Sequence, residues 1–161
     1  MIKTLLSATV AGLVAFSGAS TASAAEGETA PIDIRMTLHE SSMIHEYPGE
    51  DGPLWSGRGM FDFSVLLTDV GEGNEQGVTV FLSVPDTLDV RSWGDGWSCE
   101  DTEGGIDCYH PDLVVPGEAW PELHFRGFPS NHVQDTIDVY ATTGDYAPAH
   151  EGVHYFNDTS T

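Results

Sequence analysis

Apolar residues at every second position are the feature that most constrains this chain. In residues 61–69 they are Phe61, Phe63, Val65 and Leu67, and the same alternation recurs in residues 32–39, 78–84, 87–93, 122–128 and 135–142. A period of two places alternate side chains on one face of a strand. Gly-rich turn sequences such as "YPGEDGP", "DVGEGNEQG" and "DTEGG" separate the runs, and no later segment shows a helical apolar stripe. The pattern predicts an all-β sandwich of about seven or eight short antiparallel strands.

The first 24 residues have the layout of a secretory signal peptide. Lys3 precedes the apolar run "LLSATVAGLVAF", and small residues at Ala22 and Ala24 suit a cleavage site. The final "FNDTST" has no apolar tail, so we expect no C-terminal anchor. We therefore expect a secreted, extracellular protein that the cell wall either releases or retains loosely.

Composition limits the partners that such a protein can bind. Without the first 24 residues the chain keeps four arginines and all 26 acidic residues, which gives a net charge of −22 with neutral histidines. A surface this negative repels nucleic acids and anionic membranes. It favours solubility and a loose attraction for divalent or basic partners. An apolar share of 40% argues against disorder.

Roughly 135 residues remain after the signal peptide, which is the size of one domain. We expect residues 25–57 to form an N-terminal strand and a Gly/Pro-rich leader. Residues 58–161 form the sandwich, and the leader belongs to the same domain.

The segment 58–157 resembles a known family of bacterial surface domains. In "GDGWSCEDTEGGIDCYHPDLVVPGEAWPELHF" the pattern is Gly-Trp-x-Cys, a hairpin turn, Cys, and a Leu-x-x-Gly step; its positions are Trp97, Cys99, Cys108, Leu113 and Gly117. The preceding hairpin leads into Pro85 to Leu88, as in that family. The resemblance is to the conserved-repeat domain of unknown function in secreted and wall-bound actinobacterial proteins. It implies an immunoglobulin-like sandwich and no catalytic residues. That family usually occurs in tandem copies on anchored proteins, whereas this chain has one copy.

Cys99 and Cys108 are the two cysteines of the chain, and "GG" lies near the midpoint between them. A hairpin would bring them side by side, and in an exported protein such a pair predicts a disulfide. A zinc site that adds His110 is the less favoured alternative, because no C-x-x-C knuckle is present. Trp97 would share a strand face with Cys99 and pack against the bridge.

The segment "HEGVH", residues 150–154, matches the zinc-protease signature H-E-x-x-H. That signature requires a helix, which brings both imidazoles to one metal. Here Pro148 and Gly152 oppose a helix and "VHYF" favours a strand, on which His150 and His154 would be about 13 Å apart. Seven residues follow His154, too few to supply the usual third ligand. We therefore interpret the match as coincidental.

Two sets of residues remain as weak binding candidates. Asp69, Glu72, Asn74 and Glu75 lie in one acidic turn that could hold calcium through oxygen ligands. Trp55 and Trp93 lie beside glycines rather than inside alternating runs, so either could contact a sugar or a protein. Either could instead close one end of the core.

The sequence thus predicts a secreted, non-catalytic binding or spacer module that needs no cofactor. Its partner would be a protein or a glycan at the cell surface. The alternatives are a calcium-dependent carbohydrate-binding module and, less favoured, a metal-dependent hydrolase that uses His150 and His154.

Overall fold

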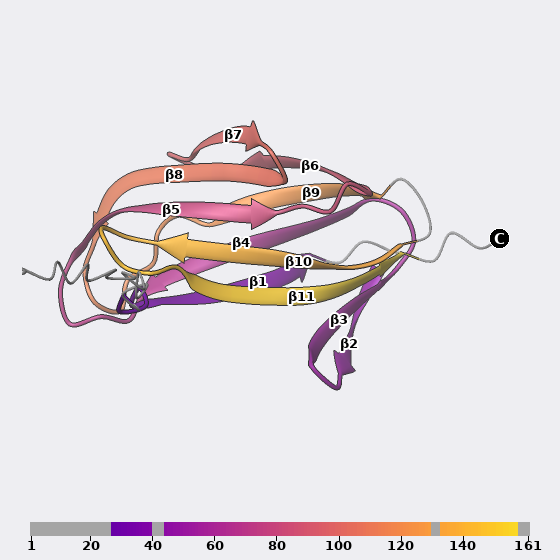
Figure 1. The fold of residues 1–161 in the computed structure, drawn as a ribbon, viewed down its shortest axis with the longest axis horizontal. Helices are drawn as coiled ribbons and strands as arrows, with labels where there is room; N and C mark the ends of the chain where they lie inside the picture. The colour runs from indigo at the N-terminus through magenta and orange to yellow at the C-terminus, as the bar shows by residue number, and fades with distance from the viewer. Residues whose placement is uncertain (1–26, 40–43, 130–132, 158–161) are drawn as a thin grey trace, which may run out of the picture.

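The computed structural model describes residues 27–39, 44–129 and 133–157, and within these ranges the secondary structure consists of strands (Figure 1). The strands are β1 (Ile32–His39), β2 (Ile44–Gly49), β3 (Gly52–Gly57), β4 (Phe61–Asp69), β5 (Glu75–Ser83), β6 (Leu88–Trp93), β7 (Ser98–Thr102), β8 (Gly105–Val114), β9 (Leu123–Pro129), β10 (Val133–Thr142) and β11 (Ala149–Asn157). The predicted signal peptide lies outside the described residues. Within them, no helix is long and apolar enough to cross a membrane.

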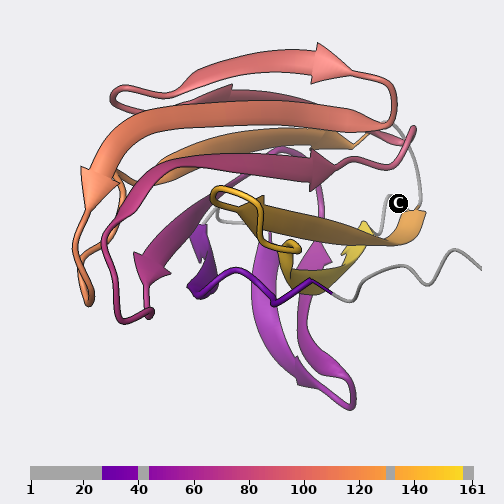
Figure 2. The same cartoon turned by 60° about the vertical axis from the view of Figure 1, so that its left-hand side comes forward.

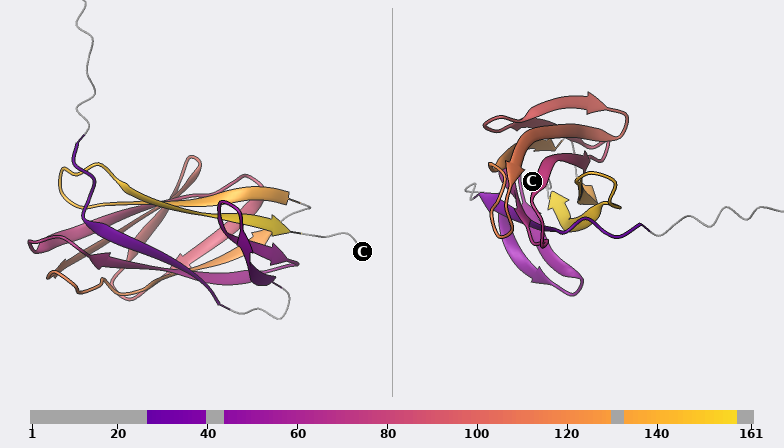
Figure 3. Two further views of the ribbon diagram at one scale, coloured as in Figure 1. Left: turned by 90° about the horizontal axis from the view of Figure 1, so that it is seen from below. Right: turned by 90° about the vertical axis from the view of Figure 1, so that its left-hand side faces the viewer.

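The strands form two packed sheets. One has the order β1-β4-β9-β6, and the other has the order β2-β3-β11-β10-β5-β8-β7. Strands of both sheets run along the long axis of the molecule (Figure 3). The predicted all-β sandwich is confirmed, with eleven strands in the described residues instead of seven or eight. The sheets are also not purely antiparallel, because β3 pairs with β11 in parallel.

The alternating runs bury the faces that the sequence predicts. On β4, Phe61, Phe63, Val65 and Leu67 are at most 1% exposed. The inward residues of β5 and β10 are buried in the same way. Each fully buried side chain of this size contributes about 1.5–3 kcal/mol through removal of apolar surface from water. The period of two therefore determines which face of each strand enters the core.

An aromatic cluster connects the sheets at one end of the core. Phe61 stacks on Tyr155 of β11 at a centroid distance of 4.9 Å, and Phe63 stacks on Phe125 of β9 at 5.1 Å. Trp55 of β3 meets Phe61 edge to face at 6.2 Å. Its indole Nε1 donates a hydrogen bond of 2.9 Å to Glu46 of β2.

Trp55 corrects one sequence expectation. Its side chain is 0% exposed, so it has no surface to offer a sugar or a protein partner. The parallel pairing of β3 with β11, in which Trp55 lies opposite Tyr155, carries the indole into the core. The sequence left two roles open for Trp55, contact with a partner and closure of one end of the core; its burial assigns it to the core.

The β2–β3 hairpin is the main element that the alternation does not predict. It projects beyond the body of the sandwich (Figures 1 and 2). Its exposed residues include Tyr47, Pro48 and Pro53, and Gly52 makes the turn with a φ of 125°. The predicted leader, residues 25–57, therefore contributes one strand to the smaller sheet and two to the larger one.

The β7–β8 hairpin contains the predicted disulfide. Cys99 and Cys108 are cross-strand partners whose sulfurs are bonded, with a Cα–Cα distance of 4.1 Å. Cys108 is buried and Cys99 packs against the core. Trp97 is partly buried against the core; its ring meets His110 edge to face at 5.1 Å, and its indole donates a hydrogen bond of 2.7 Å to the carbonyl of Pro121.

Candidate binding face

Charge is unevenly distributed between the two sheets. The seven strands of the larger sheet contain no arginine or lysine, while they carry nine acidic residues: Glu46, Glu75, Glu100, Asp101, Asp107, Asp112, Asp135, Asp138 and Glu151. The four strands of the smaller sheet carry Arg35, Arg91 and Arg126 together with Asp33, Asp62, Asp69 and Asp89. Three of the four arginines after Lys3 therefore lie on one sheet of a chain whose formal charge is −21.

Strand register brings the polar residues of the smaller sheet together on its outward side. Trp93 of β6 is the cross-strand partner of His124 on β9, which in turn is the partner of Ser64 on β4. In the adjacent row, Arg91 of β6 lies opposite Arg126 of β9, and Arg126 lies opposite Asp62. We define the Arg/Trp face as six residues that point outward from β4, β6 and β9: Asp62, Arg91, Trp93, His124, Arg126 and Phe128.

Arg126 is fixed by a two-pronged contact with Asp62. Its Nε and Nη2 donate hydrogen bonds of 2.6 and 2.7 Å to the two carboxylate oxygens. This hydrogen bonding, supported by the charges of Arg126, His39 and His124, lowers the pKa of Asp62 even though partial burial opposes the shift. The same contact raises the pKa of Arg126. The guanidinium is thereby held in one orientation.

Aromatic rings support both arginines. The guanidinium carbon of Arg126 lies 5.7 Å from the ring centroid of Trp93, and that of Arg91 lies 5.3 Å from the ring centroid of Phe128. Trp93 also stacks on His124 with a centroid distance of 5.7 Å and an interplanar angle of 14°. Trp93 nevertheless stays 45% exposed. The result is an indole that is held in place and still open to solvent.

A serine, a histidine and a glutamate meet beside this face, and their geometry differs from that of a nucleophilic site. Ser64 Oγ donates a hydrogen bond of 2.5 Å to a carboxylate oxygen of Glu122, and His39 Nε2 lies 2.8 Å from Ser64 Oγ. Because the serine proton is directed at Glu122, His39 must donate to Ser64. A catalytic base would accept that proton instead. Ser64 is also 0% exposed. The trio fixes His39 on the sheet.

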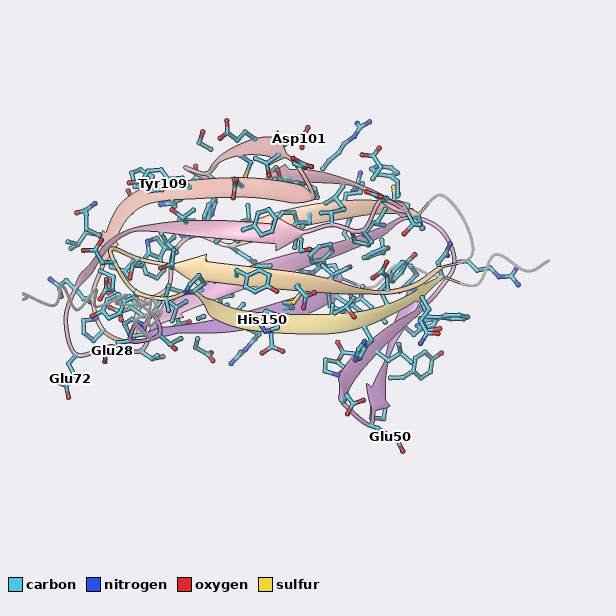
Figure 4. All side chains as sticks on the ribbon, viewed as in Figure 1. Glu28, Glu50, Glu72, Asp101, Tyr109 and His150 are labelled. Atoms are coloured by element: carbon cyan, nitrogen blue, oxygen red, sulfur yellow. A yellow bond between two sulfur atoms is a disulfide. The ribbon has the colours of Figure 1, made fainter. Side chains whose placement is uncertain are left out.

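The "HEGVH" segment lies on β11, as the sequence predicts. His150 Nε2 contacts Asp138 at 2.8 Å, and His154 Nδ1 contacts the hydroxyl of Thr136 at 3.2 Å. Both partners are on the neighbouring strand β10. His150 is exposed on the outer face of the larger sheet (Figure 4). Within residues 27–39, 44–129 and 133–157, no group of three His, Cys, Asp or Glu side chains is arranged to hold a metal.

The acidic turn does not bring its four candidate ligands together. Asp69 is 0% exposed at the end of β4, and one of its oxygens accepts a 2.8 Å hydrogen bond from the amide of Gly71. Glu72 and Asn74 are exposed, and Glu72 points away from the molecule at the tip of the turn (Figure 4). Glu75 begins the next strand. The calcium hypothesis has no assembled ligand set in this turn.

Among the members of the Arg/Trp face, only Trp93 was a binding candidate on the basis of the sequence. The other members come from β4, β6 and β9, which are far apart in the sequence, and they occupy outward positions, whereas the strand prediction rests on the inward apolar residues. A signal was available: three of the four arginines fall within alternating runs, at outward positions. Joining them required the register between strands.

No protein-family model matches the chain, and no curated protein matches it. The resemblance to the actinobacterial repeat domain therefore stays a prediction. Among solved structures, the chain is similar to the seventh ScaB type I cohesin of Pseudobacteroides cellulosolvens, with 11% identity, coverage of 78% of this chain and 94% of that chain, and a TM-score of 0.46. It is also similar to a non-cellulosomal cohesin of the archaeon Archaeoglobus fulgidus (8% identity, 76% and 92% coverage, TM-score 0.44). A third similarity is to a cohesin module from a Clostridium perfringens family 33 glycoside hydrolase (9%, 77% and 100%, TM-score 0.42). These similarities concern the arrangement of strands and assign no ligand to this chain.

Proposed function

We propose that this protein is an exported, non-catalytic binding module that engages a protein partner through the Arg/Trp face. The observation that carries the proposal is the concentration of an exposed tryptophan and a pair of opposed arginines on one sheet of an otherwise acidic molecule. The predicted signal peptide and the Cys99–Cys108 disulfide support export.

The residue types on this face are those that dominate protein interfaces. Tryptophan and arginine are the side chains most enriched at positions where truncation costs the most binding energy. Trp93 and Arg126 are held by their neighbours before any partner arrives. Binding therefore loses little side-chain entropy at these positions.

Electrostatics favours this face over the larger sheet for most partners. At least about 10 Å of stacked sheets separates the two outward faces, which exceeds the Debye length of about 8 Å at physiological ionic strength. A partner on the smaller sheet therefore encounters a balanced local charge of three arginines and three aspartates, Asp33, Asp62 and Asp89, because Asp69 is buried. It is largely screened from the acidic strands behind.

The test compares two exposed aromatic residues on opposite sheets. Trp93 is 45% exposed and Tyr109, on the larger sheet, is 48% exposed. Proteins captured from the extracellular fraction by the wild-type protein would be purified, and the affinity of each for the wild type, Trp93→Ala and Tyr109→Ala would be measured in binary binding assays. We expect Trp93→Ala to weaken the binary affinity about thirty-fold, which corresponds to about 2 kcal/mol, and Tyr109→Ala to change it less than about two-fold.

Two outcomes contradict the proposal. One is a purified partner whose affinity falls with Tyr109→Ala and not with Trp93→Ala. The other is an affinity for a purified glycan that depends on Trp93 when every captured protein binds both variants equally, because that result assigns the face to carbohydrate.

A further inference from the structure

Arg91 and Arg126 are directly opposed on adjacent strands of a chain that has very few basic residues. Their Cα atoms are register partners in the β6–β9 ladder. Like charges in this position disfavour the pairing unless something compensates them. Asp62 compensates Arg126 with two hydrogen bonds. Within the described residues, no carboxylate forms an ion pair with Arg91, although the chain has 26 acidic residues.

The guanidinium of Arg91 is nevertheless positioned. It lies over the ring of Phe128 at 5.3 Å, a cation–π contact that restricts its position without using its N–H donors. Asp89 precedes it by two residues on the same outward side of β6 and makes no ion pair with it within the described residues. Of the two opposed guanidiniums, only that of Arg126 has a carboxylate partner within the described residues, and a second planar acceptor at Arg91 would complete the arrangement.

We infer that Arg91 is the recognition residue for a carboxylate on the protein partner, an aspartate or glutamate side chain that docks beside Trp93. A planar guanidinium with unused donors binds a carboxylate through two parallel hydrogen bonds. The arriving group would pair with Arg91 as Asp62 pairs with Arg126, which would relieve the repulsion between the two arginines. This inference rests on the proposed function and adds the chemistry of the partner.

Charge also decides between a protein and an acidic polysaccharide as the source of the carboxylate. A polyuronate carries a negative charge on every sugar and would extend beyond the Arg/Trp face over acidic surface of a chain with a formal charge of −21. A protein can present one or two carboxylates within a surface that is neutral or basic elsewhere. We therefore assign the carboxylate to a protein.

The experiment observes the arginine side chains directly by NMR of the Nε–H groups and uses small probes instead of the unknown partner. Blocked glutamate, N-acetyl-glutamate amide, is titrated into the wild-type protein at 0.15 M salt, with N-acetyl-glutamine amide as the neutral match. Arg35 is an internal control, because it is an exposed arginine on the same sheet and no described contact places an aromatic ring under it. We expect saturable shifts at Arg91 Nε–H and at the Trp93 indole N–H with the glutamate probe, and none with the glutamine probe.

Two variants sharpen the result. Arg91→Lys keeps the charge and loses the planar fork, so we expect it to weaken binding of the glutamate probe about five-fold or more. Asp89→Asn removes a nearby negative charge and should strengthen binding. Equal shifts at Arg35 and Arg91, shifts with the glutamine probe, or unchanged affinity in Arg91→Lys would each overturn the inference.

A third probe tests the source of the carboxylate. Tetragalacturonate that binds more than about ten-fold tighter than the glutamate probe, with shifts at the same two residues, would overturn the assignment to a protein. Failure of the glutamate probe while Trp93→Ala still weakens a purified protein partner would reject this inference and leave the proposed function standing.

Discussion

Asp62 and Arg126 form a fork-to-fork pair across β4 and β9, with Nε and Nη2 of the arginine 2.6 and 2.7 Å from the two carboxylate oxygens. The pair lies at the centre of the Arg/Trp face, because Arg126 also contacts Trp93. It connects the two inner strands of the smaller sheet to the exposed indole at its edge. Protonation of Asp62 therefore affects the arginine that contacts Trp93.

The first prediction concerns the pH dependence of this pair. The pKa of Asp62 is lowered in the folded protein, so its contribution to stability is present above the unfolded pKa of about 3.9 and is lost as pH falls through the lower folded value. Asp62→Asn should therefore reduce the free energy of unfolding at pH 6–7, by less than about 1 kcal/mol because the pair is partly exposed. The difference from wild type should shrink below pH 4. Urea unfolding of the wild type and Asp62→Asn in each of these two pH ranges measures the difference in stability.

Asp89→Asn is the matched control for that measurement. It removes the same charge from β6 of the same sheet, where the described residues provide no ion pair for Asp89. A loss of stability that is equal in the two variants, or that persists unchanged at pH 3, would show that general charge repulsion accounts for the effect of Asp62.

The second prediction separates the two tryptophans that the sequence could not distinguish. Trp55→Ala should destabilise the protein by about 3–5 kcal/mol, because it removes a fully buried ring from the aromatic cluster. Trp93→Ala should cost about 1 kcal/mol or less, because its ring is half-exposed and loses only its stacking contacts. Thermal melts of the two variants give the comparison. A ranking in the opposite order would contradict the assigned roles.

The third prediction concerns the disulfide. Replacing both Cys99 and Cys108 by serine should lower the free energy of unfolding by about 2.5 kcal/mol on the chain-entropy account, because the closed loop is short. The native fold should persist, since each of the two sheets is also held by pairings that do not involve β7. Near-ultraviolet circular dichroism and chemical unfolding provide the measurement. Unchanged stability would mean that the bridge adds nothing to the β7–β8 pairing.

The fourth prediction concerns the histidines of "HEGVH". Replacing His150 and His154 by alanine should leave the fold intact and change stability by less than about 1 kcal/mol, because both are exposed and their side chains contact residues of β10: Asp138 and Tyr140 for His150, and Thr136 for His154. Zinc content of purified wild type and variant should be equally low. Stoichiometric zinc in the wild type that disappears in the variant would revive the metal-dependent hydrolase.

The fold was predictable where one strand carries its own signal. β4, β5 and β10 alternate strongly, so periodicity alone identifies both the strand and its buried face. β2 and β3 contain Pro48, Pro53 and several glycines, and their pairing depends on β11 far along the chain. Such non-local pairing leaves no periodic trace, and this explains why Trp55 could not be assigned to the core from its glycine neighbours.

The binding face was less predictable for a related reason. An outward position on a single strand is recognisable from sequence, but the partner of Arg91 is set by the register of β6 against β9. A shift of one residue in that register would place Arg91 beside a buried position and dissolve the arginine pair. The chemistry of the face therefore depends on alignment between strands about 35 residues apart in the chain.

The most direct test of the account is the footprint of a purified protein partner, measured by hydrogen exchange and side-chain labelling with and without the partner bound. The account predicts protection of β6 and β9 and reduced labelling of Trp93, with exchange on β10 and β11 and labelling of Tyr140 unchanged. Protection confined to β10 and β11, with Trp93 as reactive in the complex as in the free protein, would contradict it.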